Sequence, residues 1–210
     1  MKYIPVGLFL VFALSLCNLS EKLHGKKSGS GSGSSSSSNS SESSGSTAEK
    51  GVPTAAQAAA IANGQPAKWD RQGMSWTLPA NWKEQSNEAK EFLWSAPGTE
   101  ASLNVSISPM DESFPTEVSI QAFYDQAKSR AKNGEVDEVK WVEIDGLKGV
   151  QFREANPEKP DDFRRLQWMA YRKFTGQVQL INLMLASTGK YFPVHQDEMY
   201  GILYSTKITH

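Results

Sequence analysis

The run from Val178 to Leu185 constrains the fold of this chain more than any other segment of its sequence. Its residues, VQLINLML, place apolar side chains at both odd and even positions. A β-strand that carries apolar residues on both faces lies inside a sheet whose two faces are both covered. We therefore expect this run to be a central strand with a layer of structure on each side.

Other strands are expected before and after this central run. Between Ala101 and Ile107, apolar residues alternate with Ser and Asn, which is typical of a strand with one buried and one polar face. Asp145-Gly146 separates two further apolar runs and is a strong signal for a two-residue hairpin turn. The expected strands are 73–78, 91–95, 101–107, 140–144, 147–153, 164–174 and 177–187, with a short strand within 204–208.

Two segments have the periodicity of helices. From Pro115 onward, apolar residues recur at helical spacing until Asn133-Gly134 ends the pattern. A second helix is expected from Pro193 to Tyr204. Because strands and helices are segregated rather than alternating along the chain, the sequence predicts an α+β fold with a mostly antiparallel sheet and helices packed on it.

The N-terminal residues have the pattern of an export signal. Lys2 precedes an uncharged apolar run of 13 residues, Ile4–Leu16. A membrane-spanning helix needs about 20 apolar residues. The shorter run fits the apolar region of a secretory signal peptide, which we place at residues 1–17. An uncleaved anchor is the alternative interpretation of the same run.

Cys17 is the only cysteine in the chain and stands where the apolar run ends. The residues Leu14-Ser15-Leu16-Cys17 resemble the lipobox of bacterial lipoproteins, in which the cysteine is lipidated and becomes the first residue of the mature chain. Leu16 departs from the small residue that is usual before the cysteine. The resemblance implies that a lipid on Cys17 anchors the protein to the membrane of the cell envelope. If cleavage occurs elsewhere, the protein is secreted or periplasmic and Cys17 is incidental.

Residues 18–65 are expected to be a tether between the membrane and a folded domain. Ser28–Ser46 is almost entirely Ser and Gly, a composition typical of a flexible coil with a span of about 25 Å. Within the tether, residues 53–62 are predicted to form a short, loosely attached helix that begins near Pro53 and ends before Gly64. The folded domain is placed at residues 66–210.

Three segments of this domain resemble a single family. Trp76–Trp82 (WTLPANW), Glu143–Gly149 (EIDGLKG) and Met199–Ile208 (MYGILYSTKI) are similar to the opening strand, the turn before the central hairpins and the final helix of the PsbP/Mog1/DcrB-like superfamily. The resemblance extends over roughly residues 68–210 and implies an α/β/α sandwich. Its members include photosystem accessory proteins, a small-GTPase-binding factor and bacterial envelope lipoproteins, and the predicted export favours the last of these.

The composition of the domain argues against several classes of function. Residues 66–210 hold 17 Lys and Arg against 20 Asp and Glu, and this acidic balance disfavours nucleic acid as a partner. The domain has no cysteine, and His195 is its only histidine before the terminal residue. We expect His195 to be solvated or to cap a helix. Because the domain has neither a Gly-x-Ser-x-Gly turn nor a Gly-rich phosphate loop, we expect no enzyme activity, no cofactor and no metal site.

The residues that remain are candidates for binding. Trp69 and Trp82 stand beside turns and are expected to be exposed. Asp161 and Asp162 belong to an acidic, proline-interrupted loop, 155–163, that is expected to be solvated. Together these four residues form a possible partner-binding surface.

The sequence thus predicts a non-enzymatic, membrane-tethered module of the cell envelope that binds an envelope protein or a small ligand. The alternative is a periplasmic or extracellular carrier of a small apolar ligand. That function requires a closed pocket lined by the Trp residues, whereas a binding module requires an accessible surface.

Overall fold

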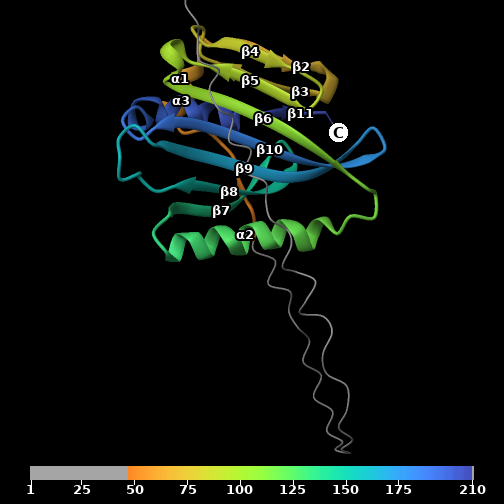
Figure 1. Cartoon of the computed structure of the whole chain (residues 1–210). Helices are drawn as coiled ribbons and strands as arrows, with labels where there is room; N and C mark the ends of the chain where they lie inside the picture. The colour runs from red at the N-terminus through yellow and green to blue at the C-terminus, as the bar shows by residue number, and fades with distance from the viewer. Residues whose placement is uncertain (1–46, 210) are drawn as a thin grey trace, which may run out of the picture. The chain divides into compact units, whose positions relative to one another are not determined.

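An eight-stranded sheet is the centre of the structure (Figure 1), with the strand order β1-β7-β8-β9-β10-β6-β5-β4. The computed structural model of the chain describes residues 47–209, and the predicted signal peptide, Cys17 and the Ser-rich part of the tether lie outside them. The strands are β1 (Glu49–Lys50), β4 (Lys83–Asn87), β5 (Glu91–Ser95), β6 (Ala101–Met110), β7 (Val136–Ile144), β8 (Leu147–Glu154), β9 (Phe163–Phe174) and β10 (Gln177–Thr188). Neighbouring strands are antiparallel except for β1 and β7, which run parallel.

Within residues 47–209, helix α2 covers one face of the large sheet, and helix α3 and a smaller sheet cover the opposite face, with α1 packed against α3 (Figure 1). The helices are α1 (Ala55–Ile61), α2 (Thr116–Lys132) and α3 (Phe192–Tyr204), with short 3-10 helices η1 (Asp70–Gln72) and η2 (Pro97–Thr99). The small sheet has the order β11-β3-β2, formed by β11 (Lys207–Ile208), β3 (Met74–Leu78) and β2 (Gln65–Trp69). These layers confirm the predicted α+β fold with a mostly antiparallel sheet.

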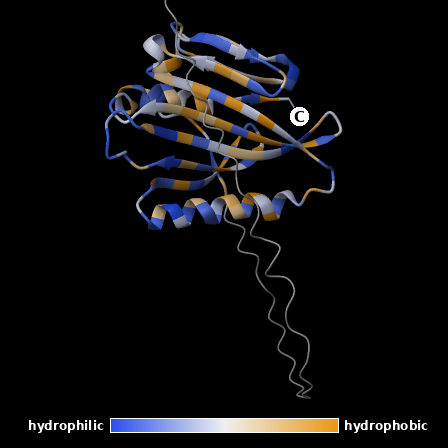
Figure 2. Cartoon of the chain, in the orientation of Figure 1, coloured by the Kyte–Doolittle hydropathy of each residue, from blue (hydrophilic) through white to orange (hydrophobic). Residues whose placement is uncertain are grey.

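Adjacent residues of one strand enter different hydrophobic cores, because successive side chains point to opposite faces of a sheet. In β7, Trp141 belongs to the smaller core, where it stacks on Tyr124 of α2, whereas the next residue, Val142, belongs to the larger core that contains Met199 of α3. Figure 2 shows the same alternation of hydrophobic and hydrophilic residues along β6. The large sheet therefore separates two cores, one on each face.

Strand β10 contains the apolar run that predicted a central strand, and it is the fifth of the eight strands. On the face toward α3, Ile181, Leu183 and Leu185 have no exposed surface. On the opposite face, Leu180 and Met184 stay partly exposed, because α2 packs mainly over β7, β8 and β9. The predicted central position is confirmed, but the covering layer is complete on only one face of this strand.

Regular structure begins upstream of residue 66, where we expected the domain to start. Glu49 of β1 pairs with Val142 of β7, so the sheet already includes residues assigned to the tether. Helix α1 packs against α3 instead of being loosely attached. The approach is close because Gly201 has no side chain: a Cβ there would lie 2.5 Å from the backbone oxygen of Gln57. No periodic pattern in the sequence predicts that α1 packs against α3.

Strands β2 and β4 also lack a sequence pattern that predicts them. The residues of β4, KEQSN, are all polar, and this edge strand exists because it pairs with β5. The pairing contains a register shift between Glu84 and Ser86. In β2, Pro66 and Lys68 interrupt the apolar residues.

Within residues 47–209, no helix is both long enough and apolar enough to cross a membrane.

Candidate functional site

The two Trp residues predicted to be exposed are buried, so this part of the prediction is wrong. Trp69 and Trp82 have exposed fractions of 0% and 1%. Trp69 stacks on Phe92 with ring centroids 5.7 Å apart, and its indole N–H donates to the backbone oxygen of Glu88 at 2.7 Å. Both side chains belong to the core between the small sheet and the large sheet. Their position beside turns does not expose them, because the flanking strands direct their rings inward.

Asp161 and Asp162 are exposed, as is the neighbouring Phe163. The backbone N–H of Gly189, just after β10, donates to the backbone oxygen of Asp162 at 2.9 Å. The backbone N–H of Lys190 donates to the oxygen of Pro160 at 2.8 Å. The acidic loop is therefore held against the end of β10 while its carboxylates face solvent. Its role in binding a partner stays a prediction.

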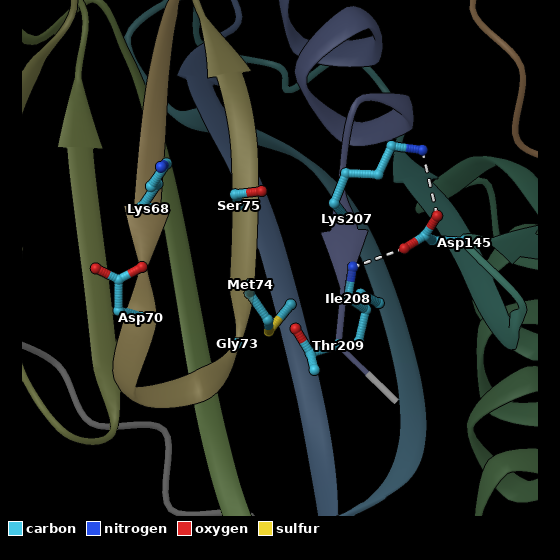
Figure 3. A pocket seen from close by; sticks show the side chains of 9 residues that line it. All are labelled: Lys68, Asp70, Gly73, Met74, Ser75, Asp145, Lys207, Ile208 and Thr209. Atoms are coloured by element: carbon cyan, nitrogen blue, oxygen red, sulfur yellow. Dashed lines mark hydrogen bonds and ion pairs between the residues drawn. The ribbon is translucent and has the colours of Figure 1, made fainter.

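A pocket of about 420 Å³ lies on the small sheet, away from the residues singled out in the sequence (Figure 3). We call it the Lys68 pocket. It is lined by Lys68, Asp70, Gly73, Met74, Ser75, Asp145, Lys207, Ile208 and Thr209. These residues come from β2, η1, β3, the β7–β8 turn and the end of the chain. Six of the nine lining residues are polar or charged, and none is Trp.

Three of these residues form one row across the small sheet. Ser75 of β3 pairs with Lys68 of β2 on one side and with Lys207 of β11 on the other. Directly paired residues of antiparallel strands point to the same face. The neighbouring row contains Met74 and Ile208, which are buried. The Lys68–Ser75–Lys207 row therefore points away from the core, and Figure 3 shows its members on three adjacent strands.

Asp145 fixes the last strand at one side of the pocket. Its carboxylate accepts the backbone N–H of Ile208 at 2.7 Å and contacts the ammonium group of Lys207 at 3.2 Å. Asp145 stands in the β7–β8 turn with a φ of +48°, a conformation that Asp adopts more readily than most residues. Lys207 is 71% exposed at its side chain, so the ion pair itself is weak.

Several polar groups of the pocket have no side-chain partner among residues 47–209. These are the ammonium group of Lys68, the carboxylate of Asp70 and the hydroxyl of Ser75. The pocket thus offers donors and acceptors that are free to bind a ligand. Polar groups converging on one concave surface are the usual means by which a protein orients a small molecule.

A buried arginine lies behind the Gly73 side of the pocket. Arg172 is 5% exposed, and its guanidinium donates to Gln179 at 3.1 Å and to the backbone oxygen of Gln72 at 2.7 Å. Its Nη1 group has no hydrogen-bond partner within residues 47–209, and no carboxylate there pairs with it. Burial lowers the pKa of Arg172 to about 10. Its positive charge is therefore not compensated by a neighbouring carboxylate in the described part of the chain.

A separate polar cluster joins α3 to the large sheet; we call it the Glu138 cluster. The hydroxyl of Tyr200 donates to Glu138 at 2.9 Å, and the hydroxyl of Tyr204 donates to Gln151 at 3.0 Å. Gln151 in turn donates to Glu138, and Arg153 donates to the Tyr200 oxygen at 3.2 Å. Burial, and then the charge of Glu138, raise the pKa of Tyr200. Because each of these groups already has a partner, the cluster fastens the helix.

His195 is enclosed between two carboxylates rather than solvated. Its ring nitrogens lie 2.8 Å from Glu198 of the same helix and 3.4 Å from Glu100, next to the start of β6. Its side chain is 12% exposed. Within residues 47–209, no group of three or more His, Cys, Asp and Glu side chains could hold a metal ion. His195 does not line the Lys68 pocket.

The sequence analysis did not identify the Lys68 pocket because its residues are far apart in the chain. Strand alternation places Ser75 on the polar face of β3, and Asp145-Gly146 marks a turn. Neither signal says that the turn lies beside the end of the chain. Only the pairing of β11 with β3 brings Lys207 next to Ser75.

Comparison with known proteins gives structural relatives but no sequence relatives. No protein-family model and no curated protein match the sequence. LpqN of Mycobacterium tuberculosis, described as involved in cell envelope biogenesis, is 13% identical with a TM-score of 0.50, and the match covers 70% of this chain and 86% of LpqN.

Two other solved structures are more weakly similar. A protein of Bacteroides thetaiotaomicron VPI-5482 is 13% identical with a TM-score of 0.45 over 70% of this chain, which spans about half (49%) of that protein. The Saccharomyces cerevisiae Ran-binding protein Mog1p is 10% identical with a TM-score of 0.43, over 70% of this chain and 95% of Mog1p. It is the likeness to LpqN that bears on the fold. The chain adopts an α+β fold like that of LpqN, consistent with the PsbP/Mog1/DcrB-like sandwich that the sequence predicted.

Proposed function

We propose that this chain is a non-enzymatic binding module of the cell envelope, tethered to the membrane by a lipid on Cys17. The observation that carries the envelope assignment is the fold shared with LpqN, a protein involved in cell envelope biogenesis. The apolar run before Cys17 supports export, and the position of the only cysteine at its end supports lipidation. The two lines of support are independent, since one comes from residues 47–209 and the other from the leader.

The surroundings of the titratable groups support binding rather than catalysis. His195 has a carboxylate on each side, and Tyr200 donates to Glu138, so these groups are already engaged. A general base must instead reach the proton of a substrate. The Lys68 pocket has no His or Cys in its lining, and its free groups are suited to orienting a polar ligand.

The carrier of a small apolar ligand stays a prediction without support from the pocket. That function requires a cavity lined by Trp residues. Trp69, Trp76 and Trp82 are instead packed in the core, where Trp76 stacks on Phe92 with ring centroids 5.0 Å apart. The Lys68 pocket is polar, so it does not fit an apolar guest.

The tether is tested by mass spectrometry of the mature protein from the native membrane fraction. We expect a chain that begins at Cys17 and carries a lipid on that residue. A Cys17→Ala variant should then leave the membrane fraction or retain its leader. Recovery of an unmodified, soluble wild-type chain would overturn the lipid anchor.

Binding to an envelope component is tested by photo-crosslinking in intact cells. A photoreactive amino acid replaces Asp161, in the exposed acidic loop, and a matched variant carries it at Val118, which is 70% exposed on α2. We expect a discrete adduct from position 161 and a much weaker one from position 118. Equal labelling from both positions, or no adduct from either, would count against a partner at this loop.

A further inference from the structure

We infer that the Lys68 pocket binds a phosphate group. The inference rests on the proposed function only in taking the domain to be a binding module. The ligand chemistry follows from the donors that the pocket presents, from the weakness of the bonds that already engage them, and from the charge of the wall behind them.

The donors converge from neighbouring strands. Lys68 and Lys207 are each one strand away from Ser75, on the same face of the small sheet. Adjacent strands lie about 4.8 Å apart, so the two lysine backbones are separated by about 10 Å. Each flexible lysine stem can bring its ammonium group over the Ser75 hydroxyl between them. An oxyanion at that point meets two positive charges and a hydroxyl donor.

Existing contacts leave these donors available. The Lys68 ammonium group has no partner among residues 47–209. Lys207 contacts Asp145 at 3.2 Å, but the Lys207 side chain is 71% exposed, and an ammonium group in contact with water is easily exchanged from such a pair. Asp145 also accepts the Ile208 N–H at 2.7 Å, so its carboxylate keeps a partner when Lys207 turns toward a ligand.

Arg172 adds charge behind the pocket wall. It donates to the backbone oxygen of Gln72, the residue before Gly73, and is buried without a carboxylate partner in the described part of the chain. Among the lining residues, Lys68 and Lys207 balance Asp70 and Asp145 in charge, and Arg172, which is not part of the lining, adds one further positive charge beside Gly73. Because a buried charge acts through a medium of low dielectric constant, Arg172 favours an anion in the pocket without touching it.

These features favour phosphate over other ligands. Lysine is a common phosphate ligand that acts as a point charge, and a phosphate group, with about two negative charges and three strong acceptor oxygens, can accept from two ammonium groups and a hydroxyl at once. The volume of about 420 Å³ is larger than a phosphate ion needs and leaves room for an attached organic group. Asp70, at the rim, can accept a hydrogen bond from a hydroxyl on that group. The shared chemistry is therefore a phosphate, free or as the ester of a lipid headgroup.

The test is isothermal titration of the full chain, with Cys17→Ser to prevent lipidation, in an uncharged detergent at constant ionic strength. Inorganic phosphate probes the free ion, and glycerophosphoglycerol probes the headgroup of an anionic phospholipid. We expect saturable binding of at least one, weakened about tenfold by Lys68→Gln and by Lys207→Gln. Lys68→Arg should retain most of the affinity. Lys83→Gln, a change to an exposed lysine on the edge strand β4, should leave the affinity unaltered.

The two probes distinguish free phosphate from a phosphate ester as the ligand of the pocket. Similar affinity for both probes assigns the pocket to free phosphate, and binding of glycerophosphoglycerol alone assigns it to a headgroup ester. No saturable heat with either probe, or binding that survives both Lys→Gln changes, overturns the inference. Such a failure would leave a lipidated Cys17 and an adduct at position 161 untouched, so it is distinguishable from a failure of the proposed function.

Discussion

The hydroxyl of Tyr200 donates a hydrogen bond to the carboxylate of Glu138 at 2.9 Å and so fastens α3 to β7. Tyr200 is 4% exposed. Two neighbouring residues bind the same pair: Gln151 donates to the carboxylate of Glu138, and Arg153 donates to the hydroxyl oxygen of Tyr200. Glu138 is partly buried, and a carboxylate withdrawn from water in this way is costly unless it is paired, so the members of the cluster stabilise the fold together.

Replacement of Tyr200 by Phe should destabilise the domain by about 1–3 kcal/mol, because the ring stays while the partly buried, charged carboxylate of Glu138 loses a hydrogen-bond donor. Urea unfolding followed by Trp fluorescence measures the change. Tyr191→Phe is the matched control, since no hydrogen bond of its hydroxyl is found among residues 47–209. Equal losses for the two variants would contradict the role given to the Tyr200–Glu138 bond.

The advantage of wild type over Tyr200→Phe should also depend on pH. Burial and Glu138 raise the pKa of Tyr200 above its ordinary value of 10.0. Because the pKa of Tyr200 is higher in the folded state, its contribution to the free energy of unfolding is complete below pH 10. The contribution decreases as the pH rises above 10, because the Tyr200 hydroxyl then ionises in the unfolded chain before it ionises in the folded one. The difference in unfolding free energy should shrink by about 1.4 kcal/mol per pH unit above 10.

Unfolding of both proteins from pH 7 to about pH 11 checks this expectation. Other titrating groups, Arg172 among them, are common to the two chains and cancel in the difference. A difference that stays constant up to pH 11 would show that the Tyr200 pKa is not raised by folding.

Replacement of Gly201 by Ala should detach α1 from α3. The added methyl group would lie 2.5 Å from the Gln57 oxygen, which is too close for a non-bonded contact. Overpacking of this kind costs about 1–3 kcal/mol. Hydrogen exchange should become faster in residues 55–61, while Asp197→Ala, on the exposed side of α3, should leave it unaltered. Unchanged protection of α1 in the Gly201 variant would contradict the close packing.

Replacement of Asp145 by Ala should loosen β11. The change removes the acceptor of the Ile208 N–H and places Ala at a φ of +48°. The lost hydrogen bond and the backbone strain together cost about 2 kcal/mol. Asp145→Asn keeps an acceptor oxygen and tolerates the same backbone, so it should retain most of the stability. Hydrogen exchange at the Ile208 amide separates the two variants. Equally fast exchange in both would count against the hydrogen bond from Ile208 to Asp145 as the contact that holds β11.

Local patterns in the sequence were sufficient to predict most of the elements. The alternation from Ala101 to Ile107, the Asp145-Gly146 turn and the helical spacing after Pro115 all correspond to observed structure. These signals are local because the pleat of a strand and the pitch of a helix repeat within a few residues. Their order along the chain was enough to predict the fold class.

The position of a side chain relative to the two sheets was decided only by the tertiary structure. Trp69 and Trp82 stand beside turns, yet both are buried because the small sheet packs its inner face against β5. The polar strand β4 exists through its pairing with β5, and α1 is held by the absence of a side chain at Gly201. Each of these outcomes depends on a partner that is distant in sequence.

The candidate site depends on distant partners in the same way. Lys68, Asp145 and Lys207 belong to three separate parts of the chain, and each one alone is an ordinary surface charge. Strand pairing brings both lysines beside Ser75, and the β7–β8 turn brings Asp145 to the last strand. The sequence by itself determined most of the strands and helices, because their signals depend on nearby residues. The meeting of these charges was decided by the tertiary structure, because it depends on which strands pair.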